Sequence, residues 1–182
     1  MKTFNGQQTV ACCIGLGSNL GNSLQTLQDS WHCLGEHEEI MLQCLSAPYR
    51  TEPVGMESEH RFINAAGLLT TTLSPEALLD QLLRVEQQFG RRRDPRNNGY
   101  QDRTLDLDLL LYGDLKIETS RLQIPHPEMH KRLFVLVPLA DLAPNRLHPR
   151  FQCSLDELKL QLMHENSPLI PEQILWTPAE NN

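Results

Sequence analysis

The order of hydrophobic patterns along the chain restricts its fold more than any other feature of the sequence. Apolar runs bounded by glycine, proline or polar turns predict strands, and a 3.6-residue apolar repeat predicts a helix. Six such segments follow in the order strand, helix, strand, strand, helix, strand: 9–21, 22–34, 40–51, 62–73, 74–90 and 103–112. Asn22 and Ser74 are expected N-caps, and Pro75 follows Ser74 at the first helical position.

This order is that of a split β-α-β unit, so we expect an α+β fold with a ferredoxin-like βαββαβ core. Its antiparallel sheet should have helices on one face. We treat residues 1–182 as a single domain, because no shift in composition marks a second one. The core should span about residues 10–145, and 146–182 should form a C-terminal extension with one helix from about Ser154 to His164.

Three glycines near the start of the chain could suggest a phosphate-binding loop. They lie in GLGSNLG at Gly15, Gly17 and Gly21, but the segment lacks both the Lys-Ser/Thr ending and the dinucleotide spacing of such loops. We therefore interpret all three as turn residues.

The charge balance limits the ligands to be considered. A formal net charge of -7 and a pI near 5.5 argue against a general nucleic-acid binder. Positive charge is nevertheless concentrated in thirteen positions, at Arg91, Arg92, Arg93, Arg96 and Arg103. Such a cluster favours a local site for a small polyanion, although it could also be a solvated loop.

Signals for other compartments are missing from the sequence. No charged segment followed by an apolar run opens the chain, and no apolar run approaches the roughly twenty residues that span a bilayer. We expect a cytoplasmic protein without a membrane partner. Five cysteines, an odd number without Cys-x-x-Cys spacing, indicate reduced thiols rather than disulfides or structural zinc.

The run RTLDLDLLLYGD contains two carboxylates in an otherwise apolar strand. Asp106 and Asp108 are two residues apart and share one face, while the intervening leucines face the other way. They could form the solvated half of an amphipathic strand. They could instead hold Mg²⁺, which prefers one or two carboxylates with phosphate oxygens. The arginine-rich loop immediately upstream favours the second interpretation.

A stiffened segment follows this strand. His126 lies between Pro125 and Pro127, and Arg121 and Arg132 flank it as possible anion contacts. A lone histidine is more often a packed or surface residue than a catalytic one. No serine or cysteine is obviously paired with a histidine and a carboxylate, so a nucleophilic triad is not indicated.

Taken together, these stretches resemble the hydroxymethyldihydropterin pyrophosphokinases of folate biosynthesis. The matching motifs occur in family order: GLGSNLG at 15–21, YRTEPVG at 49–55, FINAA at 62–66, Glu86 with GRRR at 90–93, RTLDLDLLLYG at 103–113 and IPHPEMHKRLFVLVPLADLAP at 124–144. The resemblance implies a ferredoxin-like fold. It also implies transfer of pyrophosphate from ATP to the hydroxymethyl group of 6-hydroxymethyl-7,8-dihydropterin, with release of AMP.

The resemblance also implies roles for individual residues. Asp106 and Asp108 would bind two Mg²⁺ ions that bridge the triphosphate, with Arg91 and Arg93 as further catalytic residues that stabilise the transferred group. The implied ATP contacts are Glu86, Arg91, Arg93, Arg121, His126 and Arg132. The implied pterin contacts are Thr51, Pro53, Val54, Phe62, Asn64 and Phe134. The partners would be these two small-molecule substrates, with no nucleic acid, and the protein is expected to be a monomer.

One loop departs from the family pattern. The family usually has Trp-Gly-Pro-Arg before Thr-Leu-Asp-Leu-Asp, whereas this chain has NNGYQDR and two extra residues between Arg91 and Arg103. Tyr100 could replace the aromatic residue, and Asp102 adds a negative charge. The altered 94–102 loop leaves open a paralogue that acts on a different pterin. The sequence also leaves open a catalytically silent pterin- or nucleotide-binding module and a ferredoxin-like RNA-binding domain.

Overall fold

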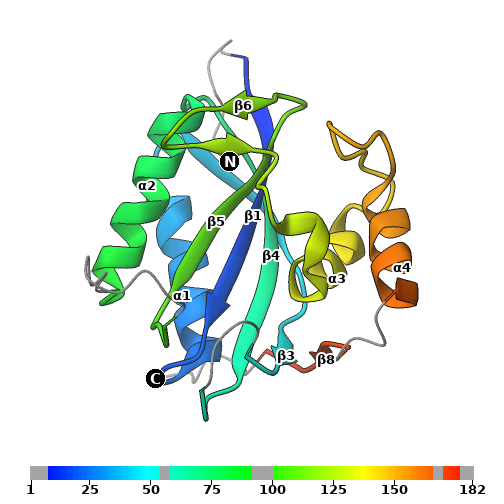
Figure 1. Ribbon diagram of the computed structural model, residues 1–182. Helices are drawn as coiled ribbons and strands as arrows, with labels where there is room; N and C mark the ends of the chain where they lie inside the picture. The colour runs from blue at the N-terminus through cyan, green and yellow to red at the C-terminus, as the bar shows by residue number, and fades with distance from the viewer. Residues whose placement is uncertain (1–7, 54–57, 92–100, 166–169, 177–182) are drawn as a thin grey trace.

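The protein is described by a computed structural model that covers residues 8–53, 58–91, 101–165 and 170–176 (Figure 1). Its elements, in chain order, are β1 (Val10–Ser18), α1 (Ser23–Glu36), β2 (Ile40–Leu45), β3 (Tyr49–Thr51), β4 (Phe62–Thr71), α2 (Pro75–Gln88), β5 (Asp106–Tyr112), β6 (Ile117–Glu118), β7 (Gln123–Ile124), a 3₁₀ turn η1 (Met129–Lys131), α3 (Leu133–Leu142), α4 (Leu155–Glu165) and β8 (Glu172–Gln173).

The main sheet of the described residues has six strands and is antiparallel throughout. Its order is β5-β1-β4-β3-β8, and β2 also pairs with β4. The β1, β4 and β5 positions are those of the split β-α-β pattern, because β1 lies between the two strands joined by α2. The expected ferredoxin-like α+β core is therefore confirmed.

The segment 40–51 forms two strands instead of the single strand expected. The break falls at Ser46, Ala47 and Pro48. Here the Ser46 N–H donates to Ala66 O at 2.8 Å, and Ser46 Oγ accepts from the Ala66 N–H at 3.0 Å. Because proline has no N–H to donate, a regular ladder cannot continue through position 48.

Two of the three glycines in the GLGSNLG segment are strand residues. Gly15 and Gly17 lie inside β1, so the expectation that they form a turn is wrong. Gly21, with a φ of +68°, does lie in the turn before α1. A Cβ atom at Gly17 would lie 3.1 Å from Asn64 Oδ1, whereas one at Gly15 would make ordinary contact with Leu110 at 3.5 Å. The close approach at position 17 is the physical reason for a glycine within the strand.

The helices α1 and α2 cover one face of the sheet, as expected (Figure 1). The Asn22 side chain accepts from the Gln25 N–H at 3.3 Å, and Ser74 Oγ accepts from the Ala77 N–H at 3.2 Å, which confirms both N-caps. The helices bury apolar side chains against the sheet: Leu27, Trp31, Leu34, Leu78, Leu82 and Val85. This layer forms the larger hydrophobic core.

The opposite face is partly covered by α3, and α4 packs against α3; both helices lie beyond the βαββαβ core in sequence (Figure 1). A second hydrophobic cluster there joins strand residues, including Cys13 and Leu110, to helix residues such as Leu136 and Leu155. The expected C-terminal helix is confirmed as α4. Its N-terminus has a reciprocal capping box, since Ser154 Oγ accepts from the Glu157 N–H at 3.1 Å and Glu157 Oε2 accepts from the Ser154 N–H at 2.7 Å.

Two further findings concern the whole of the described chain. None of its helices combines the length and apolar character that crossing a membrane requires.

All five cysteines lie in the described residues and are free thiols; Cys12 and Cys13 are buried, and Cys44 is exposed. Burial raises the pKa of Cys12 to about 12 and that of Cys13 to about 11, so both thiols are protonated at neutral pH.

Candidate active site

The floor of the candidate site is formed by the three central strands on the face opposite α1 and α2. In the ladder, Gly17 of β1 stands between Asp106 of β5 and Asn64 of β4, while Gly15 stands opposite Asp108. Residues directly opposite each other in antiparallel strands share a face. Because the glycines contribute no side chains, a depression remains between the carboxylates and the Asn64 amide.

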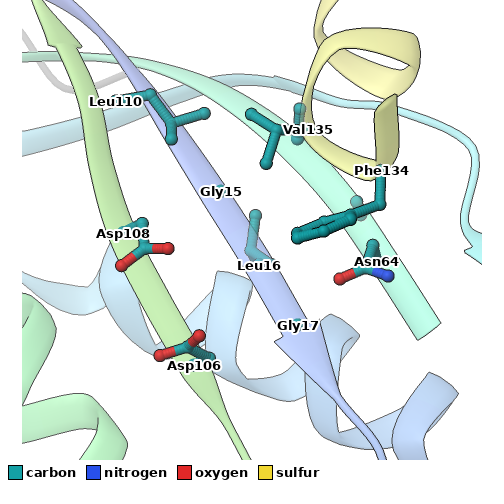
Figure 2. A pocket seen from close by; sticks show the side chains of 11 residues that line it. Gly15, Leu16, Gly17, Asn64, Asp106, Asp108, Leu110, Phe134 and Val135 are labelled. Carbon is teal, nitrogen blue, oxygen red and sulfur yellow. The ribbon is translucent and has the colours of Figure 1, made fainter. Parts of the chain in front are cut away.

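Figure 2 shows this depression with the Phe134 side chain reaching in from α3. The associated cavity measures about 30 Å³. Its lining comes from four elements, β1, β4, β5 and α3: Gly15, Leu16, Gly17, Asn64, Ala65, Ala66, Asp106, Asp108, Leu110, Phe134 and Val135. The structure therefore brings the expected metal ligands and part of the expected pterin set to one place.

The two aspartates do not belong to a solvated strand face. The side chain of Asp106 is 22% exposed, and Asp108 is also only partly exposed. Burial, followed by repulsion from Asp106, raises the pKa of Asp108 to about 7. Two adjacent, partly buried carboxylates repel each other when both are ionised. A cation between them would offset this repulsion. This arrangement supports the metal-site interpretation.

The donor set of this pair fits a hard cation such as Mg²⁺. Carboxylate oxygens are the ligands that Mg²⁺ prefers. No group of three or more histidine, cysteine, aspartate and glutamate side chains within the described residues is arranged to hold a metal alone. A divalent ion at Asp106 and Asp108 would therefore complete its coordination with water or substrate phosphate oxygens, as Mg²⁺ commonly does.

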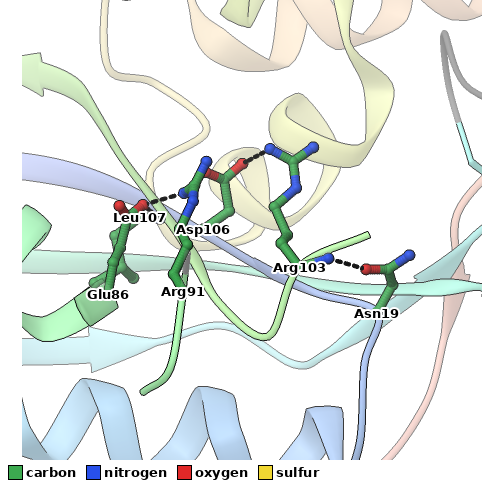
Figure 3. A network of polar contacts seen from close by, with 6 residues as sticks. All are labelled: Asn19, Glu86, Arg91, Arg103, Asp106 and Leu107. Atoms are coloured by element: carbon green, nitrogen blue, oxygen red, sulfur yellow. Dashed lines mark hydrogen bonds and ion pairs between the residues drawn. The ribbon is translucent and has the colours of Figure 1, made fainter. Parts of the chain in front are cut away.

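A network of guanidinium groups surrounds Asp106 (Figure 3). Arg91 forms ion pairs with both Glu86 and Asp106, and Arg103 Nη1 lies 2.9 Å from Asp106 Oδ2. The Glu86 side chain is 2% exposed, and its Oε1 also accepts from the Leu107 N–H at 2.9 Å. Glu86 thereby ties α2 to the edge strand β5 and holds Arg91 beside the aspartate.

Asn19, which the sequence patterns did not single out, holds the arginine segment in place. It is 4% exposed. Its side-chain Oδ1 accepts from the Arg103 backbone N–H at 2.7 Å, and the Asn19 backbone N–H donates to Arg103 O at 3.1 Å. Its Nδ2 donates to Asp102 Oδ1 at 2.6 Å. A buried asparagine needs partners for both ends of its amide, and its place directly after β1 was the available signal.

His126 and Arg132 lie near the carboxylates. Burial, and next the charge of Arg132, lower the pKa of His126, so its ring is neutral at pH 7. His126 Nδ1 accepts from the Glu128 N–H at 3.2 Å, which places the ring proton on Nε2. The Arg132 charge lowers the pKa of Asp108, against the larger effect of burial. Its guanidinium lies 5.7 Å from the centre of the Phe134 ring.

The remaining expected residues are distributed unevenly. Asn64 Nδ2 donates to Thr51 Oγ1 at 2.8 Å, which joins two members of the expected pterin set. The centre of the Phe62 ring lies 5.5 Å from the Arg103 guanidinium. Arg121 is not brought to this network: it lies between β6 and β7 and forms an ion pair with Asp80 of α2.

Three expected residues have no described contact in the site. Pro53 follows β3, and no described interaction connects it to the cavity. Arg93 and Val54 lie outside the described residues, as does most of the altered loop.

A pair of carboxylates flanked by arginines is the kind of site that binds a metal-bound polyphosphate. The chain matches the family model described as 7,8-dihydro-6-hydroxymethylpterin-pyrophosphokinase over residues 13–144. The chain belongs to this family, as its motifs had indicated.

Similar proteins carry the same family name. The chain is 36% identical over 162 residues to a 2-amino-4-hydroxy-6-hydroxymethyldihydropteridine pyrophosphokinase of Haemophilus influenzae, covering 89% of this chain and 99% of that protein. It is 43% identical over 144 residues to the Synechocystis protein of the same name, covering 79% of this chain and 72% of that protein.

A solved structure shows the same fold at low sequence identity. The Plasmodium falciparum HPPK-DHPS A437G structure with SDX-DHP matches with a TM-score of 0.72 and 15% identity, over 93% of this chain. This chain spans about half of that longer protein, 50% of its length.

Proposed function

We propose that this chain transfers the terminal pyrophosphoryl group of ATP to the hydroxymethyl oxygen of 6-hydroxymethyl-7,8-dihydropterin, releasing AMP, in folate biosynthesis. Family membership and the names of the relatives support this reaction. The structural observation that carries it is the location of Asp106 and Asp108, which stand between an arginine network and the Asn64 pocket. That arrangement has one side suited to a polyphosphate and another suited to a flat polar ring.

In this proposal Asp106 and Asp108 hold two Mg²⁺ ions. Bound there, the ions would supply positive charge beside the triphosphate oxygens. The chain contributes the carboxylates, already adjacent on one strand, and the arginines beside them. Arg91 and Arg93 stabilise the transferred group, and Arg103, which contacts Asp106 at 2.9 Å, joins them.

The ATP-binding residues divide by what they contact. His126 is neutral and carries its proton on Nε2. Its Nε2–H can therefore donate a hydrogen bond to a phosphate oxygen. Arg132, near Asp108, supplies positive charge on the same side. Arg121 would contact a more distant part of the nucleotide. Glu86, being buried against Leu107 and Arg91, acts by positioning Arg91.

The pterin would bind over the Gly17 floor. The hydrogen bond from Asn64 Nδ2 to Thr51 sets the orientation of the Asn64 amide and leaves Oδ1 facing the depression as an acceptor for a ring N–H. Phe134 supplies an aromatic face, and Phe62 is the candidate for the opposite face. Pro53 and Val54 would contribute from the segment after β3.

The test is to incubate the purified protein with Mg²⁺, ATP and reduced hydroxymethylpterin and to separate the nucleotide products. We expect AMP that depends on the pterin, with none from Asp108→Asn protein. ADP in place of AMP would mean transfer of a single phosphoryl group and would contradict the mechanism. Binding of Mg-ATP without any turnover would favour a silent binding module or a paralogue that acts on another pterin.

A further inference from the structure

The C-terminal segment runs beside the strand that carries Thr51. The β8 residues Glu172 and Gln173 pair antiparallel with Arg50 and Tyr49 of β3. The contact continues beyond the two strands: the Ile174 N–H donates to Pro48 O at 2.9 Å. Farther along, Trp176 Nε1 donates to Ser46 O at 3.0 Å.

The backbone contacts keep a single antiparallel register from position 48 to position 50, and the Trp176 side chain reaches Ser46 beyond them. The C-terminal segment therefore runs alongside the break between β2 and β3, where hydrogen bonding to β4 is irregular. The Trp176 ring also packs against the larger hydrophobic core and fastens the end of the segment. Residues 172–176, here called the C-terminal strap, lie outside the 13–144 segment that matches the family model.

The strand held by the strap is short. β3 has three residues and pairs with β4 on its other edge, with Thr51 opposite Phe62. Tyr49 OH donates to Asp141 Oδ2 of α3, and Gln173 Oε1 of the strap lies 3.4 Å from the same hydroxyl oxygen. An exposed ion pair, Arg50 with Glu172 at 3.2 Å, adds little by itself. The strap thus closes the open edge of the strand that bears Thr51.

We propose that the C-terminal strap positions Thr51, and through it the Asn64 amide, for pterin binding. Thr51 Oγ1 accepts from Asn64 Nδ2 at 2.8 Å, so a shift of β3 would turn the Asn64 amide and misalign its Oδ1. The described contacts of the strap go to β3 and its flanks and to the hydrophobic core, away from the arginine network. The inference rests on the proposed function, because it assigns the Asn64 side of the site to the pterin.

The experiment compares two proline substitutions at neighbouring positions of the strap in the full chain. Ile174→Pro removes the N–H that donates to Pro48 O. Leu175→Pro is the matched control, because alternate N–H groups of a strand point away from its partner and the Leu175 side chain is 85% exposed. Trp176→Phe is a milder variant that keeps an aromatic ring and loses the hydrogen bond to Ser46.

Two dissociation constants are measured for each protein by calorimetry. One is for 6-hydroxymethyl-7,8-dihydropterin in the presence of Mg²⁺ and a non-hydrolysable ATP analogue, and the other is for the Mg-bound analogue alone. For Ile174→Pro we expect pterin binding to weaken about threefold to tenfold, the equivalent of one hydrogen bond, with nucleotide binding changed less than about twofold. Leu175→Pro should leave both constants within about twofold.

Contrary results would separate this inference from the proposed function. Unchanged pterin affinity in Ile174→Pro, or equal weakening of both ligands, would overturn the positioning role. If Ile174→Pro does not fold, the same criteria apply to Trp176→Phe, for which a smaller but still pterin-selective loss is expected. Absence of pterin binding by the unaltered protein would overturn the proposed function itself, and the inference with it.

Discussion

On the face covered by α1 and α2, the β5 segment presents Leu105, Leu107 and Leu109, whose exposed fractions are 0%, 3% and 3%. On the opposite face the same segment presents Asp106 and Asp108, and the neighbouring strand β1 presents glycines. The first face buries apolar area and so contributes to folding. The second places like charges side by side and leaves space above the backbone. Substitutions on the two faces should therefore separate stability from activity.

The largest effect is expected from Asp108→Ala, which should lower turnover roughly 1,000-fold, because it removes a carboxylate that we propose binds Mg²⁺ at the reacting phosphates. Its free energy of unfolding should not fall, since the change removes a partly buried carboxylate that repels Asp106. Steady-state kinetics and urea unfolding measure the two quantities. Turnover close to that of the unaltered protein would contradict the assignment of Asp108 as a metal ligand.

Leu109→Ala, one position along the same strand, should have the opposite profile. Removing a buried leucine from the larger core should cost about 2–5 kcal/mol of unfolding free energy. The folded fraction should keep its turnover within a few-fold, because the side chain faces away from the site. Urea unfolding gives the first quantity. A large loss of turnover with unchanged stability would contradict the claim that the leucine face of β5 serves stability and the aspartate face serves activity.

Acid sensitivity is expected from His148, on the side of the sheet that carries the site. Its ring is 1% exposed and stacks on Phe151. Burial, followed by the charges of His130 and Arg150, lowers its pKa from 6.5 to about 4. Between these values the unfolded chain binds the proton more readily. The neutral His148 ring therefore contributes roughly 3 kcal/mol to the free energy of unfolding above pH 6.5, and this contribution is lost as the pH falls toward 4.

Urea unfolding between pH 7 and pH 4.5 measures this dependence, and His148→Phe should flatten it. The control is His32→Gln, which removes an imidazole that the fold leaves exposed. The same slope in His148→Phe and in the unaltered protein would assign the acid sensitivity to other groups.

The smallest effect is expected at the β1 glycines that line the depression, where Gly17→Ala should raise KM for the pterin about tenfold. The added methyl group would lie 3.1 Å from Asn64 Oδ1 and would displace it. Gly15→Ala is the matched control, since its methyl group would make ordinary contact with the flexible Leu110 side chain at 3.5 Å. Equal KM values for the two variants would show that the floor beside Asn64 does not shape the pterin site.

Sequence patterns predicted the parts of the site that depend on local spacing. The two-residue interval placed Asp106 and Asp108 on one strand face, and the cap signals at Asn22 and Ser74 located both core helices. The patterns did not identify Asn19, whose partners lie more than eighty residues away at Asp102 and Arg103. Contacts of that separation depend on which strands become neighbours, and local periodicity carries no information about this.

By itself, the sequence determined the order of the βαββαβ core, its antiparallel α+β class, the family and the carboxylate pair, because these follow from short-range spacing and from ordered motifs. Only the tertiary structure decided that Gly17 lies between Asp106 and Asn64, that Glu86 supports Arg91, and that the C-terminal strap borders β3. The physical reason is register. A shift of one residue between strands would turn each side chain to the other face, and the register is selected by the packing of the whole core.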